Sequence, residues 1–558
     1  MQPSLFFSMH RVVSPLTCPE LNTDLVETPL PLFIMKDFLT PEKKDAVSIV
    51  DGHTGKSLTF GETYYLSHSL ADSLRDLGLK KNDCVTVVCP NHLHYFVTFM
   101  GVSLTGAVVS LTNPLYSETE ITYQIEKSRS NLIFAHPMCL ERVLKSANGK
   151  MKIIVMDGDA PVDQELVSKH NLLLLSSLIS STPKPSKHNH ADYLLKDFDP
   201  ESVVTLPFSS GTTGKSKGVM LTHRNVVSNV LQLSSIEPKA TVLFPLPFFH
   251  IYGFGVGLLN SHYLGSKFIF MASFDFQLFL EIIEKYKVSR GYIVPPIVLS
   301  LAKQSMVDNY DLSSLKCLTC GAAPLGIEVQ ETCAKRLNVI VKQLWGMTEL
   351  SPIGTIIPDN MVTSTEELNG SSGPLVAGTE AKIVDPEDGT DLHPGQDGEL
   401  LIRGPQVMKG YLDNPEATAQ TITPDGWLRT GDIACFDEKG WMYIKDRLKE
   451  LIKYKGFQVP PAELEAIIAS MPEVKDVIVI PVPDEEAGEI PRAYVVKQPD
   501  CPPSFGEKEI IDFVHHHVAP YKRLRGGVRF TDSIPKSPSG KLLRRIQIEI
   551  DRTLHRKT

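Results

Sequence analysis

The sequence predicts an α/β fold in which a large N-terminal domain precedes a small α+β domain. A chain of 558 residues is too long for one hydrophobic core, so two or more domains are expected. Short β-rich runs alternate with longer amphipathic stretches over most of the chain, which is typical of parallel sheets covered by helices. After residue 446, the alternation of strand-like and helix-like runs begins again on a smaller scale. The predicted domains are therefore 1–446 and 447–558.

The strands expected in the large domain are runs rich in β-branched residues. They lie at 84–89, 131–134, 152–156 and 202–206. Two longer uncharged runs, 95–112 and 241–266, approach the length of a membrane span. Polar residues and Gly106 interrupt the first run, and Pro245 and Pro247 interrupt the second. We therefore expect a buried helix in the first run and a buried strand followed by a helix in the second.

The small domain is expected to contain two helices and two strands. The helices lie at 462–468 and 510–518, and the strands at 477–482 and 492–496. The segment 445–450 that precedes them is short and charged, which is typical of a hinge between two moving bodies.

Composition and charge exclude several classes of function. A hydrophobic share of 42% and a charged share of 22% are ordinary for a globular protein. A net charge of -9 argues against nucleic acid or an anionic membrane as partner, so local lysines must hold any anionic ligand. The N-terminal residues lack the pattern of a secretory signal, and the last residues do not match the peroxisomal Ser-Lys-Leu address. A cytoplasmic location is expected, with a peroxisomal or a mitochondrial location as the alternative; Arg11 and nearby serines weakly resemble a mitochondrial presequence.

The cysteines and one histidine run suggest no metal site. The chain has 9 scattered cysteines, and the close pair Cys317 and Cys320 has no second pair at metal-ligand spacing. We expect buried free thiols. The run 515–517 consists of histidines, but consecutive side chains on a helix point in different directions, so a surface position is expected.

The segment Thr205–Val219 follows a predicted strand and gathers hydroxyls, glycines and lysines. Backbone N–H groups, hydroxyls and ammonium groups together compensate the charge of a polyphosphate, so this segment predicts a phosphate-binding loop. One alternative is a Ser/Gly-rich surface turn. The other is a Walker A loop, because Lys215 and Ser216 match its ending, but Ser209 stands where that pattern needs glycine.

This loop resembles the phosphate-binding signature of the adenylate-forming enzymes. That family includes acyl-CoA synthetases, 4-coumarate:CoA ligases, beetle luciferases and peptide-synthetase adenylation domains. Further similar motifs follow in the family's order at Leu246–Gly253, Gly321–Pro324, Gln343–Glu349, Trp427–Asp432, Asp446–Glu465 and Pro535–Lys541. The resemblance implies a parallel-sheet domain with a small β subdomain, and a mobile C-terminal domain that turns about Lys449.

The resemblance also implies a two-step reaction. A carboxylic acid and Mg-ATP give an acyl-AMP and pyrophosphate, and the thiolate of coenzyme A then displaces AMP. The expected partners are therefore a small-molecule acid, ATP, Mg²⁺ and CoA, in a monomer or weak homodimer without nucleic acid or a transmembrane segment.

The nucleotide contacts that the resemblance implies come from several motifs. Trp345 offers a stacking face, Thr348 a hydroxyl for the α-phosphate, and Glu349 a carboxylate for Mg²⁺. Asp432 grips the ribose hydroxyls. Taken alone, Trp345 also fits an ordinary core residue and Glu349 a solvated helix residue. The implied ATP- and AMP-binding residues are Ser209, Ser210, Gly211, Thr212, Thr213, Gly214, Lys217, Gly321, Ala322, Ala323, Gln343, Trp345, Gly346, Thr348, Asp432, Arg447, Lys449 and Lys541.

The implied catalytic residues divide between the two steps. Lys541 offsets the charge that develops when the carboxylate attacks the α-phosphate, although its loop alone also fits a turn with a solvated lysine. His250 is the expected gate between the adenylate pocket and the CoA channel, and an ordinary core histidine is the alternative. The residues implied in thioester formation and CoA contact are Lys453, Gln458, Lys455 and Gly456.

The implied acyl pocket is closest to the 4-coumarate:CoA ligase branch, with departures at Gly255, Thr319 and Leu344. Leu344 stands where glycine is usual, so its side chain should narrow or redirect the cavity. The pocket is mostly apolar and has no basic residue for a second carboxylate, which predicts an aromatic or medium-chain acid. The expected lining residues are Ile251, Tyr252, Gly255, Ile293, Thr319, Leu344, Ser351, Pro352 and Ile353.

The same motifs also bear on alternative functions. A luciferase-like or carrier-independent adenylating enzyme shares the first step, and a P-loop NTPase is a distant alternative. A peptide-synthetase domain is less expected because the sequence ends soon after Lys541, and a dead binding homologue would need a broken motif. The products separate them, because a ligase releases AMP and pyrophosphate whereas an NTPase releases ADP and phosphate.

Overall fold

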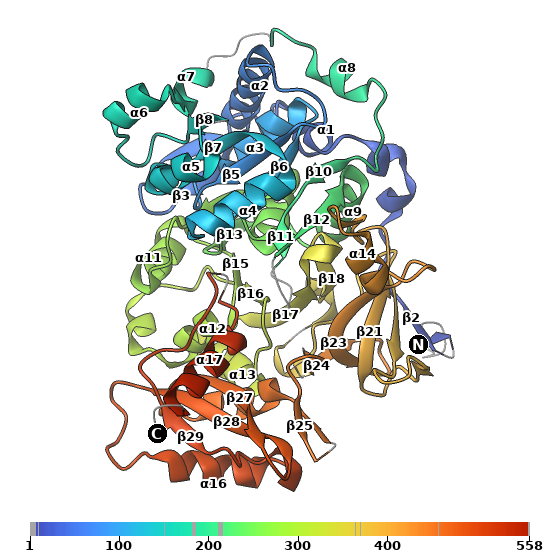
Figure 1. Ribbon diagram of the computed structural model, residues 1–558, viewed down its shortest axis with the longest axis vertical. Helices are drawn as coiled ribbons and strands as arrows, with labels where there is room; N and C mark the ends of the chain where they lie inside the picture. The colour runs from blue at the N-terminus through green and yellow to red at the C-terminus, as the bar shows by residue number, and fades with distance from the viewer. Residues whose placement is uncertain are drawn as a thin grey trace.

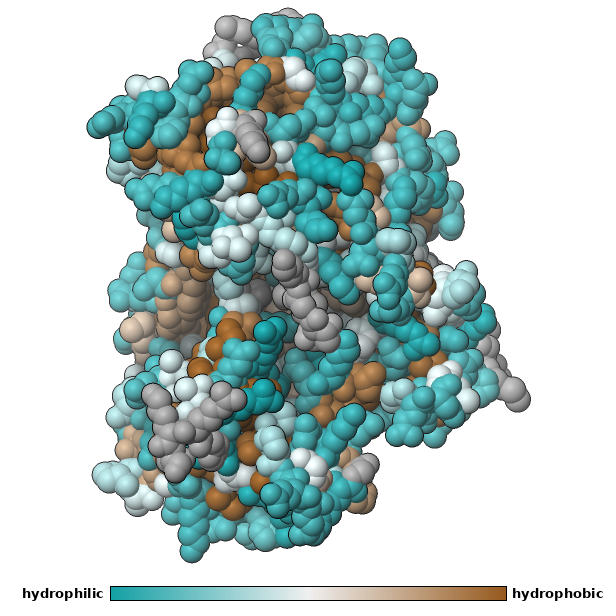
Figure 2. Space-filling view, in the orientation of Figure 1, coloured by the Kyte–Doolittle hydropathy of each residue, from teal (hydrophilic) through white to brown (hydrophobic). Residues whose placement is uncertain are grey.

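The computed structural model describes residues 7–8, 10–149, 151–180, 186–209, 216–362, 364–368, 370–455, 457–538 and 540–555. Figure 1 shows a large body and, below it, a small body formed by the C-terminal part of the chain. The face shown in Figure 2 is mostly hydrophilic, and its apolar side chains form separate patches rather than one belt. Within the described ranges, no helix is long and apolar enough to cross a membrane.

The first sheet of the large body is mostly parallel. Its order is β11 (Phe208–Ser209), β12 (Lys217–Thr222), β10 (Val203–Thr205), β6 (Val108–Thr112), β5 (Cys84–Val88), β7 (Ser130–Ala135), β8 (Lys152–Val155) and β9 (Leu173–Leu174), with β22 (Gly410–Tyr411) beside β12. The strands from β10 to β9 are parallel, whereas β12 is antiparallel to its neighbours. Every residue of β5 is buried, as expected for a strand with both faces covered. The four strands predicted from β-branched runs are confirmed.

The second sheet carries much of the site on its strand ends. Its order is β18 (Ile353–Ile356), β17 (Ile340–Gly346), β16 (Cys317–Cys320), β15 (Arg290–Ile293), β13 (Thr241–Phe244), β14 (Lys267–Phe270), β3 (Val47–Asp51) and β4 (Ser57–Thr59). The strands from β17 to β3 are parallel. The run at 241–266 forms β13 and then a buried π-helix, η5 (Tyr252–Asn260), which confirms the predicted strand and helix.

The predicted helix at 95–112 is wrong in its second half. Helix α3 (Tyr95–Leu104) is fully buried, but it ends before Gly106, which adopts a φ of 77°. Glycine takes this left-handed conformation without strain, and the chain reverses there into β6. The β-branched residues that follow Gly106 therefore belong to the sheet.

Helices cover both parallel sheets. Several begin with a capping box; in α2, Thr59 accepts from the backbone N–H of Glu62 and the Glu62 carboxylate accepts from that of Thr59. The α-helices of the large body besides α3 are α1 (Leu30–Met35), α2 (Phe60–Asp76), α4 (Glu118–Ser128), α5 (Leu140–Ala147), α6 (Gln164–His170), α7 (Leu175–Leu178), α8 (His190–Leu195), α9 (His223–Ser234), α10 (Ser261–Leu264), α11 (Phe276–Tyr286), α12 (Pro295–Lys303), α13 (Ile327–Leu337) and α14 (Pro415–Thr421).

A third, antiparallel sheet completes the large body. It contains β1 (Phe7–Ser8), β2 (Arg11–Val13), β19 (Glu380–Val384), β21 (Gly398–Arg403), β23 (Leu428–Phe436) and β24 (Met442–Arg447), with β20 (Asp391–Leu392) beside β19. This sheet is the small β subdomain that the resemblance implied. Its last strand, β24, leads directly into the small body (Figure 1).

The small body is α+β, as predicted. Its sheet has the order β26 (Phe457–Val459), β25 (Ile452–Tyr454), β28 (Gly488–Lys497) and β27 (Val474–Asp484), with β29 (Val528–Phe530) beside β28. Its α-helices are α15 (Pro461–Ser470), α16 (Glu507–His517) and α17 (Arg544–His555). The histidine run at the end of α16 is exposed, as expected.

The two bodies have separate hydrophobic cores. One large cluster of buried residues extends from Val12 to Met442, and another extends from Ile452 to Val528. The proposed boundary at 446 falls inside β24, between the two clusters, and it stays a prediction. All cysteines are free thiols, and all except Cys435 and Cys501 are buried.

Candidate active site

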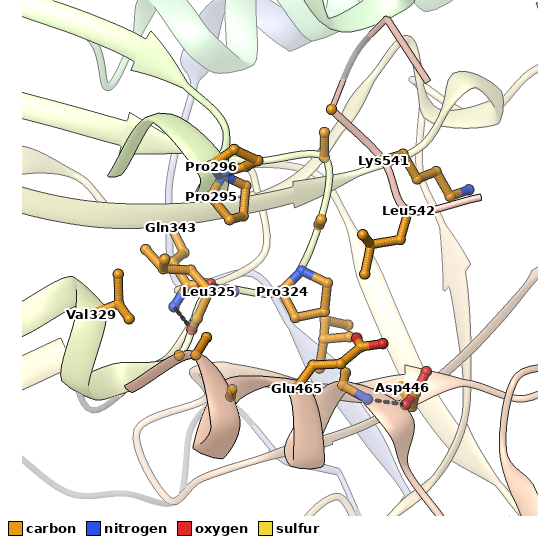
Figure 3. Close-up of a pocket in the computed structure, with 18 of the residues that line it drawn as sticks. Pro295, Pro296, Pro324, Leu325, Val329, Gln343, Asp446, Glu465, Lys541 and Leu542 are labelled. Carbon is orange, nitrogen blue, oxygen red and sulfur yellow. Dashed lines mark hydrogen bonds between the residues drawn. The ribbon is translucent and has the colours of Figure 1, made fainter. Parts of the chain in front are cut away.

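A cavity of about 260 Å³ lies between the large and small bodies. The large body contributes the start of α12, the turn after β16, the end of β17, and β23 and β24. The small body contributes α15 and the segment that leads into α17. Figure 3 shows Lys541 and Leu542 on one side of this cavity, Gln343 and Leu325 on the other, and Glu465 along its floor.

Many of the predicted nucleotide residues line this one cavity. They are Ala322, Ala323, Gln343, Trp345, Gly346, Asp432, Arg447 and Lys541. They come from distant motifs. Those around β16 and β17 lie at or just after the ends of these neighbouring strands, Asp432 and Arg447 pair on β23 and β24, and Lys541 comes from the small body. Five other predicted nucleotide residues, all described, do not line it: Ser209, Lys217, Gly321, Thr348 and Lys449.

Gln343 holds the turn that forms the cavity wall. Its side chain donates to the carbonyl of Leu325 at 3.2 Å and accepts from the N–H of Leu325 at 3.3 Å. It also donates to Gln330 on α13 at 2.9 Å. Ala322, in the same turn, adopts a φ of 71°, which places its backbone against the cavity.

Asp432 lies on β23 with two partners. The indole N–H of Trp345 donates to its Oδ2 at 2.8 Å, and Nε of Arg447 lies 3.6 Å from its Oδ1. Strand pairing places Arg447 directly opposite Asp432. Burial raises the pKa of Asp432, and the charge of Arg447 opposes this rise. Trp345 is thus more than a core residue, because it orients a carboxylate on the cavity wall.

Glu349 is buried, which rules out the solvated-helix alternative. The hydroxyl of Tyr411 donates to its Oε1 at 2.9 Å, and the hydroxyl of Ser209 donates to the same oxygen at 3.1 Å. Tyr411 was not among the predicted site residues, because its two-residue strand β22 has no periodic pattern in the sequence. Burial and Glu349 raise the pKa of Tyr411, so its hydroxyl stays a donor at neutral pH.

The phosphate loop is described only at its two ends. Ser209 on β11 pairs with Lys217 on β12, and the ammonium of Lys217 lies 4.8 Å from the ring centroid of Tyr411. Ser209 and Lys217 therefore lie beside the Glu349 site. The predicted phosphate ligands Ser210, Gly211, Thr212, Thr213 and Gly214, and also Lys215, lie outside the described residues.

Lys541 enters the cavity from the small body. Burial and the charge of Arg447 lower its pKa to about 8, whereas Glu450, Asp432 and Glu349 oppose that fall. The preceding Gly540 has a φ of 80°, and a Cβ there would lie 3.1 Å from Val294. A larger residue would therefore press the loop against the large body.

His250 lies near Lys541. Burial and the charge of Lys541 lower the pKa of His250 to about 4, so the imidazole is neutral at pH 7. Its Nδ1 accepts from the N–H of Tyr252 at 3.3 Å, at the start of the π-helix.

The residues predicted for thioester formation lie elsewhere. Lys453 and Gln458 face each other across the β25–β26 hairpin, and both are exposed. Lys455, in the turn of this hairpin, is exposed and forms an ion pair with Glu486. Gly456 lies outside the described residues. None of the described hairpin residues lines the cavity.

The predicted acyl-pocket residues are all described, and all are buried. The hydroxyl of Tyr252 donates to the carbonyl of Thr319 at 3.4 Å. A Cβ on Gly255 would lie 2.6 Å from Pro352, and a Cβ on Gly321 would lie 2.7 Å from Leu344. Leu344 is the one member of the set that lines the cavity, and its side chain packs against Gly321.

Similarity searches place these features among known proteins. A family model described as AMP-binding enzyme matches residues 40–412, and one described as AMP-binding enzyme C-terminal domain matches residues 463–541. A probable 4-coumarate–CoA ligase 1 of Dictyostelium discoideum is 40% identical over 94% of this chain and 95% of its own length. A 4-coumarate–CoA ligase 2 of Petroselinum crispum is 40% identical over 90% of each chain.

Solved structures with low sequence identity share the fold. An anthranilate CoA ligase in complex with anthranoyl-AMP has a TM-score of 0.84 at 23% identity, covering 96% of this chain and 100% of its own. A benzoate CoA ligase from Burkholderia xenovorans LB400 has a TM-score of 0.78 at 22% identity, covering 93% and 99%. The predicted fold class is confirmed.

Proposed function

Because this chain belongs to the AMP-binding enzyme family and is an ATP-dependent acid:CoA ligase that acts through an acyl-AMP, we propose that both of its steps occur in the cavity between the two bodies. The main support for this proposal is that Asp432, Arg447 and Lys541 line one cavity. The negative charge of Glu349 also raises the pKa of Lys541 and so favours its ammonium form. These groups suit a ribose, a phosphate chain and a bound cation.

In the proposed first step, a carboxylate oxygen of the acid attacks the α-phosphorus of ATP. The bond from that phosphorus to the pyrophosphate oxygen breaks, and pyrophosphate leaves with the electron pair. Two anions must approach each other, so the ammonium of Lys541 stabilises the transition state. With a pKa of about 8, Lys541 is mostly charged at pH 7. Asp432 and Arg447 hold the ribose, and Trp345 keeps Asp432 in place.

Glu349 fits the role of an Mg²⁺ ligand. Its buried carboxylate is fixed by Tyr411 and Ser209 next to the phosphate loop. A single carboxylate suits Mg²⁺, which keeps several waters and binds substrate phosphates. When bound, the ion neutralises charge on the departing pyrophosphate.

In the proposed second step, the thiolate of CoA attacks the acyl carbonyl carbon. The bond from that carbon to the AMP oxygen breaks, and AMP leaves with the electron pair. In this proposal, His250 is the gate between the adenylate pocket and the CoA channel, and its neutral imidazole adds no charge there. The hairpin that carries Lys453 and Gln458 must reach the cavity for this step, so the small body has to turn about the segment around Lys449.

We propose an aromatic or a medium-chain acid as the substrate. The acyl-pocket residues are buried and mostly apolar, and none is basic. The curated relatives are 4-coumarate ligases, which supports an aromatic acid. Leu344 narrows the junction between nucleotide and acid, so the ring of a substituted cinnamate meets a smaller opening than glycine would leave.

A panel of acids tests this proposal. Each acid is mixed with Mg-ATP and CoA, and the release of AMP and pyrophosphate is measured. We expect turnover with aromatic and medium-chain acids, and Leu344→Gly should extend the range to bulkier ring substituents. Turnover with acetate or dicarboxylic acids alone would contradict the substrate proposal, and release of ADP would contradict the reaction.

A further inference from the structure

The two bodies also meet at Lys303, outside the wall of the cavity. Lys303 is the last residue of α12 in the large body. Its ammonium donates to three backbone carbonyls of the small body: Ala469 at 2.9 Å, Met471 at 2.7 Å and Val474 at 2.9 Å. An ammonium has three N–H donors, so these bonds use all of them.

Two of the acceptors, Ala469 and Met471, lie where helix α15 ends, and the third, Val474, begins strand β27. This helix ends at Ser470, and the last carbonyls of a helix lack intrahelical partners and carry partial negative charge. A cation at this end is favourable, and hydrogen bonds from a charged donor are stronger than neutral ones. Burial lowers the pKa of Lys303 to about 8, so the ammonium form predominates at pH 7.

Lys303 links two helices that form facing walls of the cavity. Helix α12 begins with Pro295 and Pro296, and α15 carries Glu465 and Ala469, all of which line the cavity. Helix α13 contacts both helices. Fixing α15 against α12 therefore fixes the width of the cavity that Lys541 enters.

We propose that Lys303 is a positioning residue for the adenylation step, because it holds the small body in the arrangement that places Lys541 in the cavity. This inference rests on the proposed function, in which the small body turns between the two steps. The three acceptors all belong to the small body, so the turn must break all three bonds. Removing them should therefore slow the first step and leave the second step intact or faster.

Lys303→Met tests this role, because methionine keeps a long flexible side chain but has no donors. We expect acid-dependent ATP–pyrophosphate exchange to fall about tenfold, mainly in kcat, from the loss of charge-assisted hydrogen bonds. Thioester formation from supplied acyl-AMP and CoA should match or exceed the wild-type rate. The matched control is Lys335→Met on α13, whose ammonium pairs with Glu331 of its own helix.

A second readout does not depend on turnover. The enzyme is treated briefly with an amine-reactive acylating reagent, and labelling of Lys541 is measured by peptide mass spectrometry. We expect Lys541 to be labelled several-fold faster in Lys303→Met than in the wild type, while exposed lysines such as Lys508 react equally in both. If Lys303→Met fails to fold, Lys303→Gln, which keeps two donors, should show the same changes in exchange and in Lys541 labelling, with smaller magnitude.

The outcomes separate the two proposals. Equal losses in both half-reactions, or unchanged exchange together with unchanged Lys541 labelling, would overturn the role of Lys303. A wild-type enzyme that forms no acyl-AMP would instead overturn the proposed function, and the labelling of Lys541 would still test whether Lys303 holds the two bodies together.

Discussion

The Lys541 segment and the β25–β26 hairpin belong to the same small body, yet they lie in opposite environments. Lys541 is enclosed by the cavity, and burial lowers its pKa to about 8. Lys453 and Gln458 on the hairpin are exposed and do not line the cavity. Each segment carries residues assigned to a different half-reaction, so this arrangement of the two bodies suits the first step.

The difference also shows which parts of the site are shared. Asp432, Trp345 and Arg447 belong to the large body or to its last strand, and they are held by hydrogen bonds and strand pairing. In the proposed mechanism these residues hold the AMP portion, which is present in both ATP and acyl-AMP, so we expect them to serve both steps. In the proposed mechanism, the small body presents Lys541 in the first step and the β25–β26 hairpin in the second. Substitutions of Lys541, of the hairpin and of the shared nucleotide residues should therefore affect the two steps differently.

The largest effect is expected for Lys541→Ala. Losing a charge that stabilises the transition state should reduce acid-dependent ATP–pyrophosphate exchange by about 10²–10³-fold. Thioester formation from supplied acyl-AMP should stay within about twofold of the wild type, because Lys541 has no assigned role there. Arg545→Ala, which removes an exposed cation that pairs with Glu549 on the same helix, is the matched control. Equal losses in both steps would contradict the division of roles.

The reciprocal substitution is Lys453→Ala on the hairpin. It should lower thioester formation about tenfold, which is the usual cost of one charge-assisted contact, and leave pyrophosphate exchange unchanged. The two half-reactions are measured separately on the same preparation. Lys508→Ala on α16 is the control for loss of an exposed lysine of the small body. A loss of exchange would show that the hairpin also serves adenylation.

The pH dependence should also differ between the steps. Burial and Arg447 lower the pKa of Lys541 to about 8, so its ammonium persists below that pH and is lost above it. We expect kcat/KM for adenylation to be level up to about pH 8 and then to fall about tenfold per unit. The activity that remains in Lys541→Arg should not fall above pH 8, because arginine stays charged. A fall that persists in Lys541→Arg would assign the pKa to another group.

The smallest effect is expected for Trp345→Phe, which removes the indole donor to Asp432. Loss of one hydrogen bond to a carboxylate should raise KM for ATP by about fivefold. The apparent affinity for acyl-AMP in the second step should fall by the same factor, because both ligands share the ribose. An effect confined to one step would show that Trp345 does not act through Asp432.

Much of this site could be predicted from the sequence. Motifs with Trp345, Asp432, Arg447 and Lys541 were recognisable as linear segments, and the fold does bring these residues to one cavity. Alternating β-rich and amphipathic runs predicted strands of the parallel sheets and of the small body, because their periodicity is local, whereas the antiparallel sheet was expected only from the family resemblance. The helix at 95–112 was overextended, because a continuous apolar run does not reveal that Gly106 reverses the chain.

Other contacts leave no trace in a linear pattern. Tyr411 reaches Glu349 from a strand far along the chain, and only tertiary structure pairs them. Lys303 bonds to backbone carbonyls, which every residue possesses, so no side-chain motif marks its partners. The residues of the acyl pocket were predicted from the resemblance, but the packing of Leu344 against Gly321 is visible only in the structure.

A trap-and-chase experiment tests the central claim most directly. The enzyme, in molar amounts similar to the acid, is mixed with Mg-ATP and a labelled aromatic acid without CoA, and then chased with CoA. We predict that one equivalent of acyl-AMP accumulates and converts to acyl-CoA in the chase, and that Lys541→Ala fails to accumulate it yet converts acyl-AMP supplied from outside. Acyl-CoA formed without an acyl-AMP intermediate, or equal failure of Lys541→Ala in both phases, would contradict the account.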